Sequence, residues 1–204
     1  MFTSDAVILH GARTPMARYT GAFDQTSAIE LGAAAGREAI KRSGANSAEF
    51  DHVVFGNVMQ TSADAIYGAR HVGLKAGLPV ETPAVTVNRL CGSGIESISQ
   101  AAQRILLGEG NLILAGGMEN MSQCPHVIRG ARTGFRLGEG KLEDSLMSGL
   151  FDTYCGFSMS ETAENLAAEQ GITRHAFDEY ALRSQQAAEA AFKTCRMKKS
   201  SPWK

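Results

Sequence analysis

Short apolar runs alternate with helical patterns four times in the first 118 residues, and this alternation limits the possible folds more than any other feature of the chain. The four runs, each followed by a helical pattern or a glycine, lie at 6–9, 53–56, 85–87 and 112–115. Apolar runs of this length are typical of buried strands. Strands that alternate with helices predict an α/β fold, a mostly parallel sheet layered with helices.

Two helices are predicted between the first three runs. Ser27 and Glu30 have the spacing of a capping box, in which both side chains satisfy free N–H groups of a first helical turn. The segment that follows is rich in Ala and Leu, and Gly44 stands where this helix would end. A shorter helix is expected at 69–76, before Pro79.

A third helix is predicted directly after the run at 85–87. Ile95, Ile98, Ala102 and Ile105 recur at the spacing that places residues on one side of a helix. We interpret them as the apolar face of an amphipathic helix.

Composition and charge exclude several classes of protein. Hydrophobic residues make up 44% and charged residues 20% of 204 residues, which indicates a folded core and excludes disorder as the main state. Lys plus Arg number 20 against 21 Asp plus Glu, so a primary role in nucleic-acid binding has no electrostatic support. No run approaches the roughly 18 apolar residues of a membrane span, and the opening residues lack a signal-peptide pattern. We therefore expect no membrane partner and a cytoplasmic location.

The four cysteines, Cys91, Cys124, Cys155 and Cys195, lie far apart in the sequence. They form no CxxC pair and have no zinc-ligand spacing, so no metal site is predicted. Without a secretory signal, reduced thiols are expected rather than a disulfide framework.

The alternating pattern ends after residue 118. The stretch 119–156 contains Pro125, several glycines and the basic residues Arg129, Arg132 and Arg136. A long excursion of this kind is usually a binding or assembly element. Helices are expected at roughly 162–170 and 176–193. We divide the chain into an α/β core at 1–118, a loop region with two helices at 119–193, and an atypical basic tail at 194–204.

Cys91 is the strongest candidate for chemistry. It stands where the run at 85–87 gives way to a helix, next to Gly92 and Gly94, and Ser93 with Glu96 has the form of a second capping box. Free N–H groups at a helix start favour a thiolate and can hold a developing oxyanion. A nucleophile in this position suits acyl transfer through a covalent thioester.

Two other interpretations of these residues remain open. An unpaired cysteine is most often inert packing in a core. Gly92 and Gly94 also match the start of a dinucleotide-binding fingerprint, although Ser97 stands where that fingerprint has its third glycine.

Four short motifs resemble those of the thiolase family, which comprises acetyl-CoA acetyltransferases and 3-ketoacyl-CoA thiolases. They are GARTP at 11–15, VNRLCGSG at 87–94, AGGMENMS at 115–122 and MSETAEN at 159–165. The resemblance covers essentially residues 5–193 and corresponds to the N-terminal part of a thiolase.

The resemblance implies a mechanism. Cys91 would attack an acyl-CoA to give an acyl-enzyme, with its backbone N–H helping to form an oxyanion hole. A second acetyl-CoA would then take the acyl group in a Claisen condensation, and the reverse reaction would cleave a 3-ketoacyl-CoA with CoA, as in fatty acid metabolism. CoA is a substrate here, so no cofactor is implied. The loop region after Ser122 would bind CoA and support assembly into a homodimer or tetramer.

The chain also departs from the family pattern. Met159 matches a methionine near the acyl pocket, but Ser158 stands where relatives commonly have a CoA-contacting histidine. The family's activating histidine, acid/base cysteine and water-holding asparagine lie in a C-terminal half that has no counterpart here. The strand that completes the first sheet has no counterpart either. The five histidines match none of these positions. We therefore expect an incomplete thiolase that is inactive alone; the alternative is a non-catalytic truncated α/β half-domain that pairs with another chain.

Overall fold

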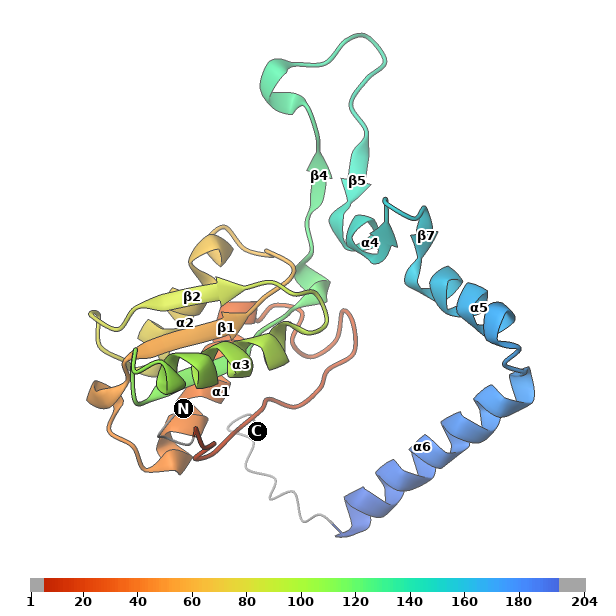
Figure 1. Ribbon diagram of the computed structural model, residues 1–204. Helices are drawn as coiled ribbons and strands as arrows, with labels where there is room; N and C mark the ends of the chain where they lie inside the picture. Colours follow the sequence, from red (N-terminus) through yellow and green to blue (C-terminus); the bar gives the residue numbers. More distant parts are fainter. Residues whose placement is uncertain (1–5, 195–204) are drawn as a thin grey trace. The chain divides into compact units, whose positions relative to one another are not determined.

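The structure, a computed structural model, describes residues 6–194 (Figure 1). The chain forms two compact units, one up to His126 and the other from Val127 onward. The predicted α/β architecture is confirmed, with helices layered on a parallel sheet in the first unit.

The first unit is built on three parallel strands. They are β1 (His52–Gly56), β2 (Ala84–Val87) and β3 (Ile113–Gly117), in the order β2-β1-β3. Val54 at the centre of β1 aligns with Val85 on one side and Ala115 on the other. Three of the four predicted strands are thus confirmed. Parallel strands bring their carboxyl ends to one edge of the sheet, where the loops after β1, β2 and β3 begin.

The remaining predicted strand, the one at 6–9, is wrong in this structure. These residues have no regular secondary structure, and Val7, Ile8 and Leu9 are all exposed. A strand needs a neighbour for its N–H and C=O groups, and within the described residues β3 pairs only with β1. The apolar composition of 6–9 therefore predicted a strand, but no strand of the described chain pairs with this segment.

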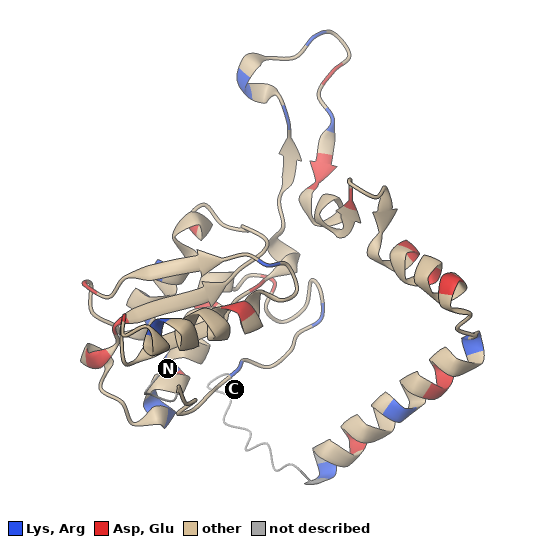
Figure 2. Cartoon of the chain, in the orientation of Figure 1, with Lys and Arg blue, Asp and Glu red and all other residues tan. Residues whose placement is uncertain are grey.

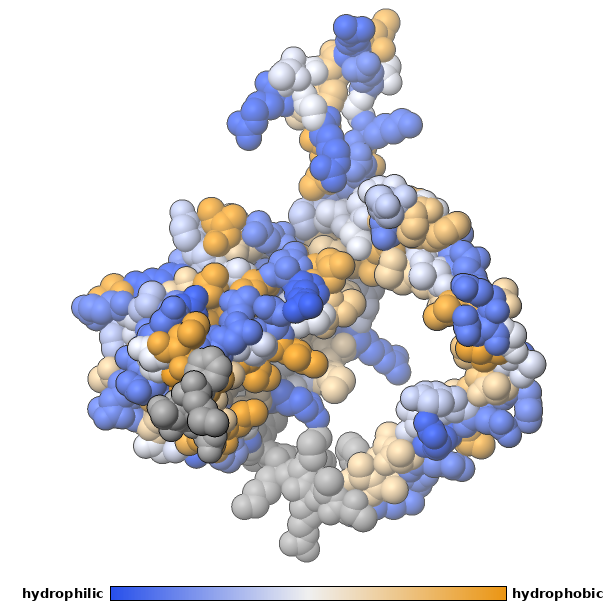
Figure 3. All heavy atoms as spheres, in the orientation of Figure 1, coloured by the Kyte–Doolittle hydropathy of each residue, from blue (hydrophilic) through white to orange (hydrophobic). Residues whose placement is uncertain are grey.

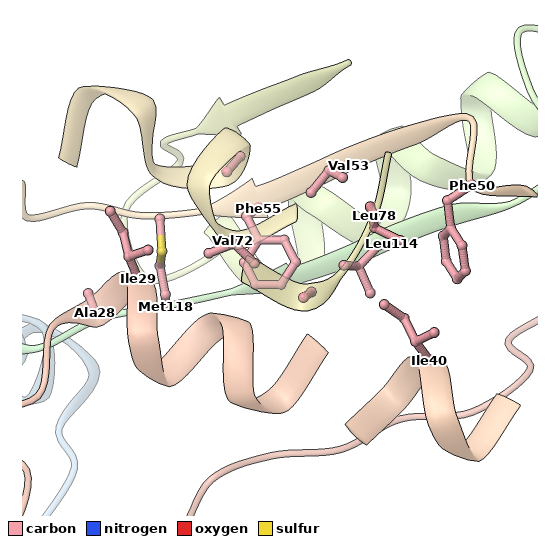
Figure 4. Close-up of a cluster of buried hydrophobic side chains, with 12 residues drawn as sticks. Ala28, Ile29, Ile40, Phe50, Val53, Phe55, Val72, Leu78, Leu114 and Met118 are labelled. Atoms are coloured by element: carbon pink, nitrogen blue, oxygen red, sulfur yellow. The ribbon is translucent and has the colours of Figure 1, made fainter. Parts of the chain in front are cut away.

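Two helices cover one face of the sheet and enclose the hydrophobic core. α1 (Ala28–Ser43) begins with the predicted capping box of Ser27 and Glu30 and ends at Gly44 in the left-handed conformation. α2 (Gly68–Ala76) packs beside it. Figure 4 shows large side chains of both helices meeting those of the strands. The buried cluster consists of Ala28, Ile29, Ile40, Phe50, Val53, Phe55, Ala69, Val72, Ala76, Leu78, Leu114 and Met118.

The predicted third helix, α3 (Ser93–Leu106), is confirmed, and it packs on β1 and β3. Its buried residues are Ser93, Ser97 and Ala101. The predicted apolar residues do share a side of the helix, but Ile95 is 78% exposed and Ile98 46% exposed. Figure 3 shows apolar side chains on the surface of this unit in the region where Figure 1 places α3.

Short 3₁₀ turns complete the first unit. They are η1 (Ser47–Glu49), η2 (Ala65–Tyr67) and η3 (Met121–Gln123).

The second unit consists of short hairpins followed by two longer helices. The hairpins pair β4 (His126–Ile128) with β5 (Leu142–Asp144) and β6 (Phe151–Asp152) with β7 (Phe157–Ser158); η4 (Ala131–Thr133) and α4 (Ser145–Leu150) lie in the same stretch. The helices are α5 (Met159–Gln170) and α6 (Arg174–Thr194). Both were expected, and each begins two or three residues earlier than the sequence pattern suggested. The expected tail beyond Thr194 lies outside the described residues.

α6 is a solvated helix with charges of both signs. Lys/Arg and Asp/Glu positions are interspersed along it in Figure 2, and Arg174 pairs with Asp178 and Lys193 with Glu189 at the i, i+4 spacing. Among the helices described, none is both long and apolar enough to span a bilayer.

Candidate active site

Cys91 lies in the turn that joins β2 to α3, at the carboxyl edge of the sheet. The residue is exposed and its thiol is free. No described residue makes a hydrogen bond to its Sγ. Within this chain Cys91 is therefore not part of a buried core, and its sulfur is open to a reagent.

The turn before Cys91 contains a strained residue. Leu90 has φ of 51°, in the left-handed region that side chains other than glycine rarely adopt. A conformation of this kind costs about 1–3 kcal/mol and persists only where the surroundings fix it. The fixing contacts are local: Asn88 Oδ1 accepts from the Leu90 N–H at 3.0 Å, and the Gly92 N–H donates to the Arg89 carbonyl at 3.1 Å.

Ser93 ties the two ends of this turn together. Its hydroxyl donates to the Leu90 carbonyl at 2.6 Å and accepts from the Arg89 N–H at 2.8 Å. The predicted capping box of Ser93 and Glu96 is therefore wrong. Gly92 occupies the cap position without any side-chain cap, and Glu96 instead binds the Arg89 guanidinium at 2.5 Å. The Ser93 hydroxyl cannot cap the helix because its hydrogen bonds go to the backbone of Arg89 and Leu90.

Because the cap is absent, part of the α3 terminus stays open. The N–H groups of Gly94 and Ile95 have no hydrogen-bond partner among the described residues. Such groups carry the positive end of the helix dipole. They are the kind of donor that can stabilise an oxyanion beside the turn.

The glycine at the end of β1 allows α3 to start this close to the sheet. A Cβ on Gly56 would lie 2.8 Å from the backbone of Ser93, which real Cβ atoms essentially never do. On β3, a Cβ on Gly117 would lie 3.8 Å from the Gly94 Cα, an ordinary van der Waals distance. The first residue of α3 therefore packs directly on the backbone of β1, with no side chain between.

The loops after β1 and β3 meet at the same edge through Glu119. Its carboxylate accepts hydrogen bonds from the Val58 N–H at 3.0 Å, the Met59 N–H at 3.1 Å and Asn57 Nδ2 at 2.9 Å. Burial raises the pKa of the Glu119 carboxyl, and these three donors act against that shift. Asn57 is itself buried and also donates from Nδ2 to the Met118 carbonyl at 3.1 Å.

The residues after Glu119 fasten a second segment. Asn120 Nδ2 donates to the carbonyls of Phe23 and Thr26 at 2.8 and 2.7 Å. Gln123 Nε2 donates to the Asp24 carbonyl at 2.9 Å. These anchoring roles were not found from the sequence. The available signal was that polar Glu119 and Asn120 directly follow an apolar strand, where ligand and loop contacts of parallel sheets gather.

Comparison with known proteins identifies the family. The model of the thiolase N-terminal domain matches residues 6–201 of the chain. The chain belongs to the thiolase family. This match reaches into 194–204, the stretch that was expected to lie outside the resemblance.

Individual thiolases give the extent of the similarity. The acetyl-CoA acetyltransferase of Cupriavidus necator is 44% identical over 191 residues, 93% of this chain and 48% of that protein. The mitochondrial 3-ketoacyl-CoA thiolase of Bos taurus is 47% identical over 180 residues, 88% of this chain and 45% of that protein. The chain thus spans about half the length of the curated thiolases that it matches.

Solved thiolase structures share the fold. Human mitochondrial 3-ketoacyl-CoA thiolase superposes with a TM-score of 0.86 at 44% identity, covering 92% of this chain and 49% of that one. The same human enzyme in complex with CoA also gives a TM-score of 0.86, covering 93% and 50%.

The two residues expected to bind substrate lie in the second unit of this thiolase chain. Ser158 caps α5: its backbone N–H donates to Glu161 Oε2 at 2.7 Å and its hydroxyl accepts from the Glu161 N–H at 3.3 Å. Met159 is the first residue of α5 and is exposed. Both residues thus lie at the start of α5, and their contact with substrate stays a prediction.

Two histidines of the thiolase chain, His52 and His71, have side-chain contacts in the first unit. His52 starts β1, at the edge of the sheet opposite to Cys91, and its pKa is lowered chiefly by burial. His71 on α2 contacts Asp64 at 3.1 Å and stacks on Tyr67. Within the described part of the chain, no group of three or more His, Cys, Asp or Glu side chains is placed to hold a metal ion.

Proposed function

We propose that this chain carries the acyl-accepting half of a thiolase, an acyltransferase in which Cys91 forms a covalent thioester with an acyl group from acyl-CoA. The observation that carries the proposal is the exposed Cys91 thiol on a strained turn at the start of α3. The named activities of the similar proteins, acetyl-CoA acetyltransferase and 3-ketoacyl-CoA thiolase, support the same class of chemistry.

The first step is a simple exchange of thioesters. The Cys91 sulfur, as thiolate, attacks the carbonyl carbon of acetyl-CoA and forms a new C–S bond. Negative charge gathers on the carbonyl oxygen, where N–H groups at the start of α3 can stabilise it. The bond from carbon to the CoA sulfur then breaks, CoA leaves as a thiolate and takes up a proton, and acetyl-Cys91 remains.

The second step would pass the acyl group to another acetyl-CoA. Its reverse would move the acyl group from a 3-ketoacyl-CoA to Cys91 and release acetyl-CoA, and CoA would then take the acyl group from Cys91. Transfer to acetyl-CoA or to CoA needs a base that removes a proton from the carbon or sulfur nucleophile. No described residue hydrogen-bonds the Cys91 thiol, and general bases commonly contribute about 10²–10⁴-fold. We therefore expect slow acylation and no measurable turnover from this chain alone.

Intact-mass spectrometry tests the proposal directly. After incubation with acetyl-CoA, the wild-type chain should gain one acetyl group and release one equivalent of CoA. Cys91→Ser should gain none, because a serine hydroxyl is a far weaker nucleophile without a base. A thiolysis assay run in parallel should show no steady-state turnover, and normal turnover would refute the expected need for a further base.

Binding of CoA itself is proposed to involve the second unit. The human structure that this chain resembles was determined with CoA. Arg132 and Arg136 supply positive charge between β4 and β5, where Arg129 is paired with Glu143 at 2.8 Å. By the family resemblance, Met159 would lie near the acyl chain, and Ser158 takes the place of a residue that commonly contacts CoA. Homo-oligomeric assembly and a cytoplasmic location are part of the same proposal. Several relatives are named as mitochondrial proteins, so the compartment has to be determined by experiment.

The second candidate is a non-catalytic half-domain that pairs with another chain. The exposed Ile95 and Ile98 on α3 favour it, as does β3, which pairs only with β1 among the described residues. Unpaired strand edges and apolar patches promote association. Analytical ultracentrifugation should show oligomers or aggregates, and a sharp monomer with cooperative melting would count against this candidate.

A further inference from the structure

We infer that Glu119 is a positioning residue for the nucleophile turn: it holds the loop after β1, and through that loop it fixes both ends of the turn that presents Cys91. Glu119 has no described contact with Cys91 itself, so it acts through its neighbours. The inference rests on the proposed function for the acyl-transfer part of its test only.

The first link is the convergence of three donors on one carboxylate. The backbone N–H groups of Val58 and Met59 and the side chain of Asn57 all point at Glu119, at 2.9–3.1 Å. An ionised carboxylate only accepts hydrogen bonds, and bonds to a charged acceptor are stronger than those between neutral groups. Glu119 therefore fixes three consecutive residues of the loop after β1.

The second link joins this loop to the turn before Cys91. The Asn57 N–H donates to the Val87 carbonyl at 3.1 Å. Val87 is the last residue of β2, and the turn that contains Leu90 and Cys91 starts directly after it. Any displacement of Asn57 is thus transmitted to the strand end that carries the nucleophile.

The third link reaches the far end of the turn. Gly56, next to Asn57, lies against the backbone of Ser93, the first residue of α3. Ser93 in turn binds Arg89 and Leu90 through its hydroxyl. Because the left-handed Leu90 needs surroundings that over-determine it, loosening residues 56–59 should let the turn relax and move the Cys91 sulfur.

Asp51 provides a matched control at the opposite edge of the sheet. Its carboxylate also accepts two backbone N–H groups, those of Asn111 at 2.6 Å and Leu112 at 3.2 Å, and it also joins the β1 and β3 segments. Asp51→Asn removes the charge of a bridging carboxylate without touching the nucleophile edge. A purely structural role of Glu119 should therefore give the same results as Asp51→Asn.

The test compares Glu119→Gln with Asp51→Asn in the full chain by two readouts. Saturation kinetics of acetyl-Cys91 formation should show a maximal rate at least about tenfold lower in Glu119→Gln, the effect of a misplaced nucleophile. The half-saturating acetyl-CoA concentration should stay near the wild-type value in both variants. Asp51→Asn should keep the wild-type rate.

The second readout needs no acyl transfer. Iodoacetamide alkylation of Cys91 is measured against Cys155, an exposed free cysteine of the second unit, within the same molecule. We expect the Cys91:Cys155 ratio to fall about two- to fivefold in Glu119→Gln, the size of a lost helix-terminus interaction, and to stay unchanged in Asp51→Asn.

The outcomes separate the two claims. If both variants behave alike in both readouts, the positioning role of Glu119 is overturned. If the wild-type chain forms no thioester on Cys91, the proposed function fails, and the alkylation ratio alone decides the role of Glu119. Should circular dichroism show that Glu119→Gln does not fold, Glu119→Asp, which keeps the charge but shortens the reach, replaces it with the same expected results.

Discussion

The two faces of the three-stranded sheet are packed by different rules. On one face α1 and α2 bury large side chains, among them Ile29, Val72 and Phe55, in a continuous apolar cluster. On the other face α3 contributes small residues, with Ser97 fully buried and Gly56 in contact with the helix backbone; the fully buried Val54, between Val53 and Phe55 on β1, also lies on this face. The first face holds the larger apolar cluster, and the second has the closer approach of a helix to a strand.

This difference explains where chemistry is placed on the fold. Large interlocking side chains tolerate small shifts at the cost of stability. The contact between Gly56 and the Ser93 backbone is so close that it leaves no room for a methyl group at position 56. The turn that presents Cys91 lies on the second face, where Gly56 and the hydrogen bonds of Ser93 hold it.

The largest effect on stability is expected on the first face. Ile29→Ala removes a side chain that is only 2% exposed and should lower the free energy of unfolding by about 2–5 kcal/mol. Urea unfolding measures the change. Under conditions in which the variant stays folded, its Cys91:Cys155 alkylation ratio should match wild type, and a reduced ratio would show that the two faces are not separate.

Gly56→Ala should have a smaller effect on stability and a larger one on the site. The added Cβ meets the Ser93 backbone at 2.8 Å, and overpacking of this kind typically costs about 1–3 kcal/mol. Because the start of α3 must move, formation of acetyl-Cys91 should fall at least about tenfold, as measured by intact mass against time. A variant that is destabilised yet acylated at the wild-type rate would break the link between this contact and the nucleophile.

The carboxyl groups at the two ends of the sheet, Asp51 and Glu119, have pKa values shifted in opposite directions. Hydrogen bonds from Asn111 and Leu112 lower the pKa of Asp51 below its ordinary 3.8, so its contribution to stability is present above that pH and is lost as the pH falls through the folded-state pKa. Burial raises the pKa of Glu119 above its ordinary 4.5, so its contribution is present below that pH and is lost as the pH rises through the folded-state pKa.

Opposite pH dependences should follow for the two variants. Relative to wild type, Glu119→Gln should become more stable as the pH rises from 4.5, whereas Asp51→Asn should become less stable as the pH rises from the acid side up to 3.8. Urea unfolding of all three proteins across the acid range measures both slopes. Slopes of the same sign would contradict the opposite shifts of the two carboxyls.

The smallest effect is expected on the outer side of α3. Ile95 is 78% exposed, so Ile95→Ser should change the free energy of unfolding by no more than about 0.5 kcal/mol. Thermal or urea unfolding at low protein concentration provides the measurement. A loss of several times that size would mean that Ile95 is packed after all.

The sequence predicted most of the core and less of the site, for reasons that differ residue by residue. The strands around Val54 and Val85 were predicted because consecutive apolar and β-branched residues have few other uses. The run at 6–9 failed because strand pairing depends on a neighbour that local composition does not specify. For α3, periodicity identified the apolar face but does not say which face meets the sheet.

The site shows the same limit. Cys91 was found because a cysteine between a strand and a glycine-rich helix start is a local pattern. Ser93 was assigned to a capping box because its competition with the turn's own backbone groups is not visible in the spacing. Glu119 was missed as an anchor since its partners Val58 and Met59 lie about 60 positions away in the chain.

Peptide mapping of the acetyl thioester, after brief incubation of the wild-type chain with acetyl-CoA, shows which cysteine is acylated. Our account places the label on the peptide that contains Cys91, with none on those that contain Cys124 or Cys155. A thioester spread evenly over the cysteines, or found on Cys155 instead, would show that the β2–α3 turn confers no special reactivity and would contradict it.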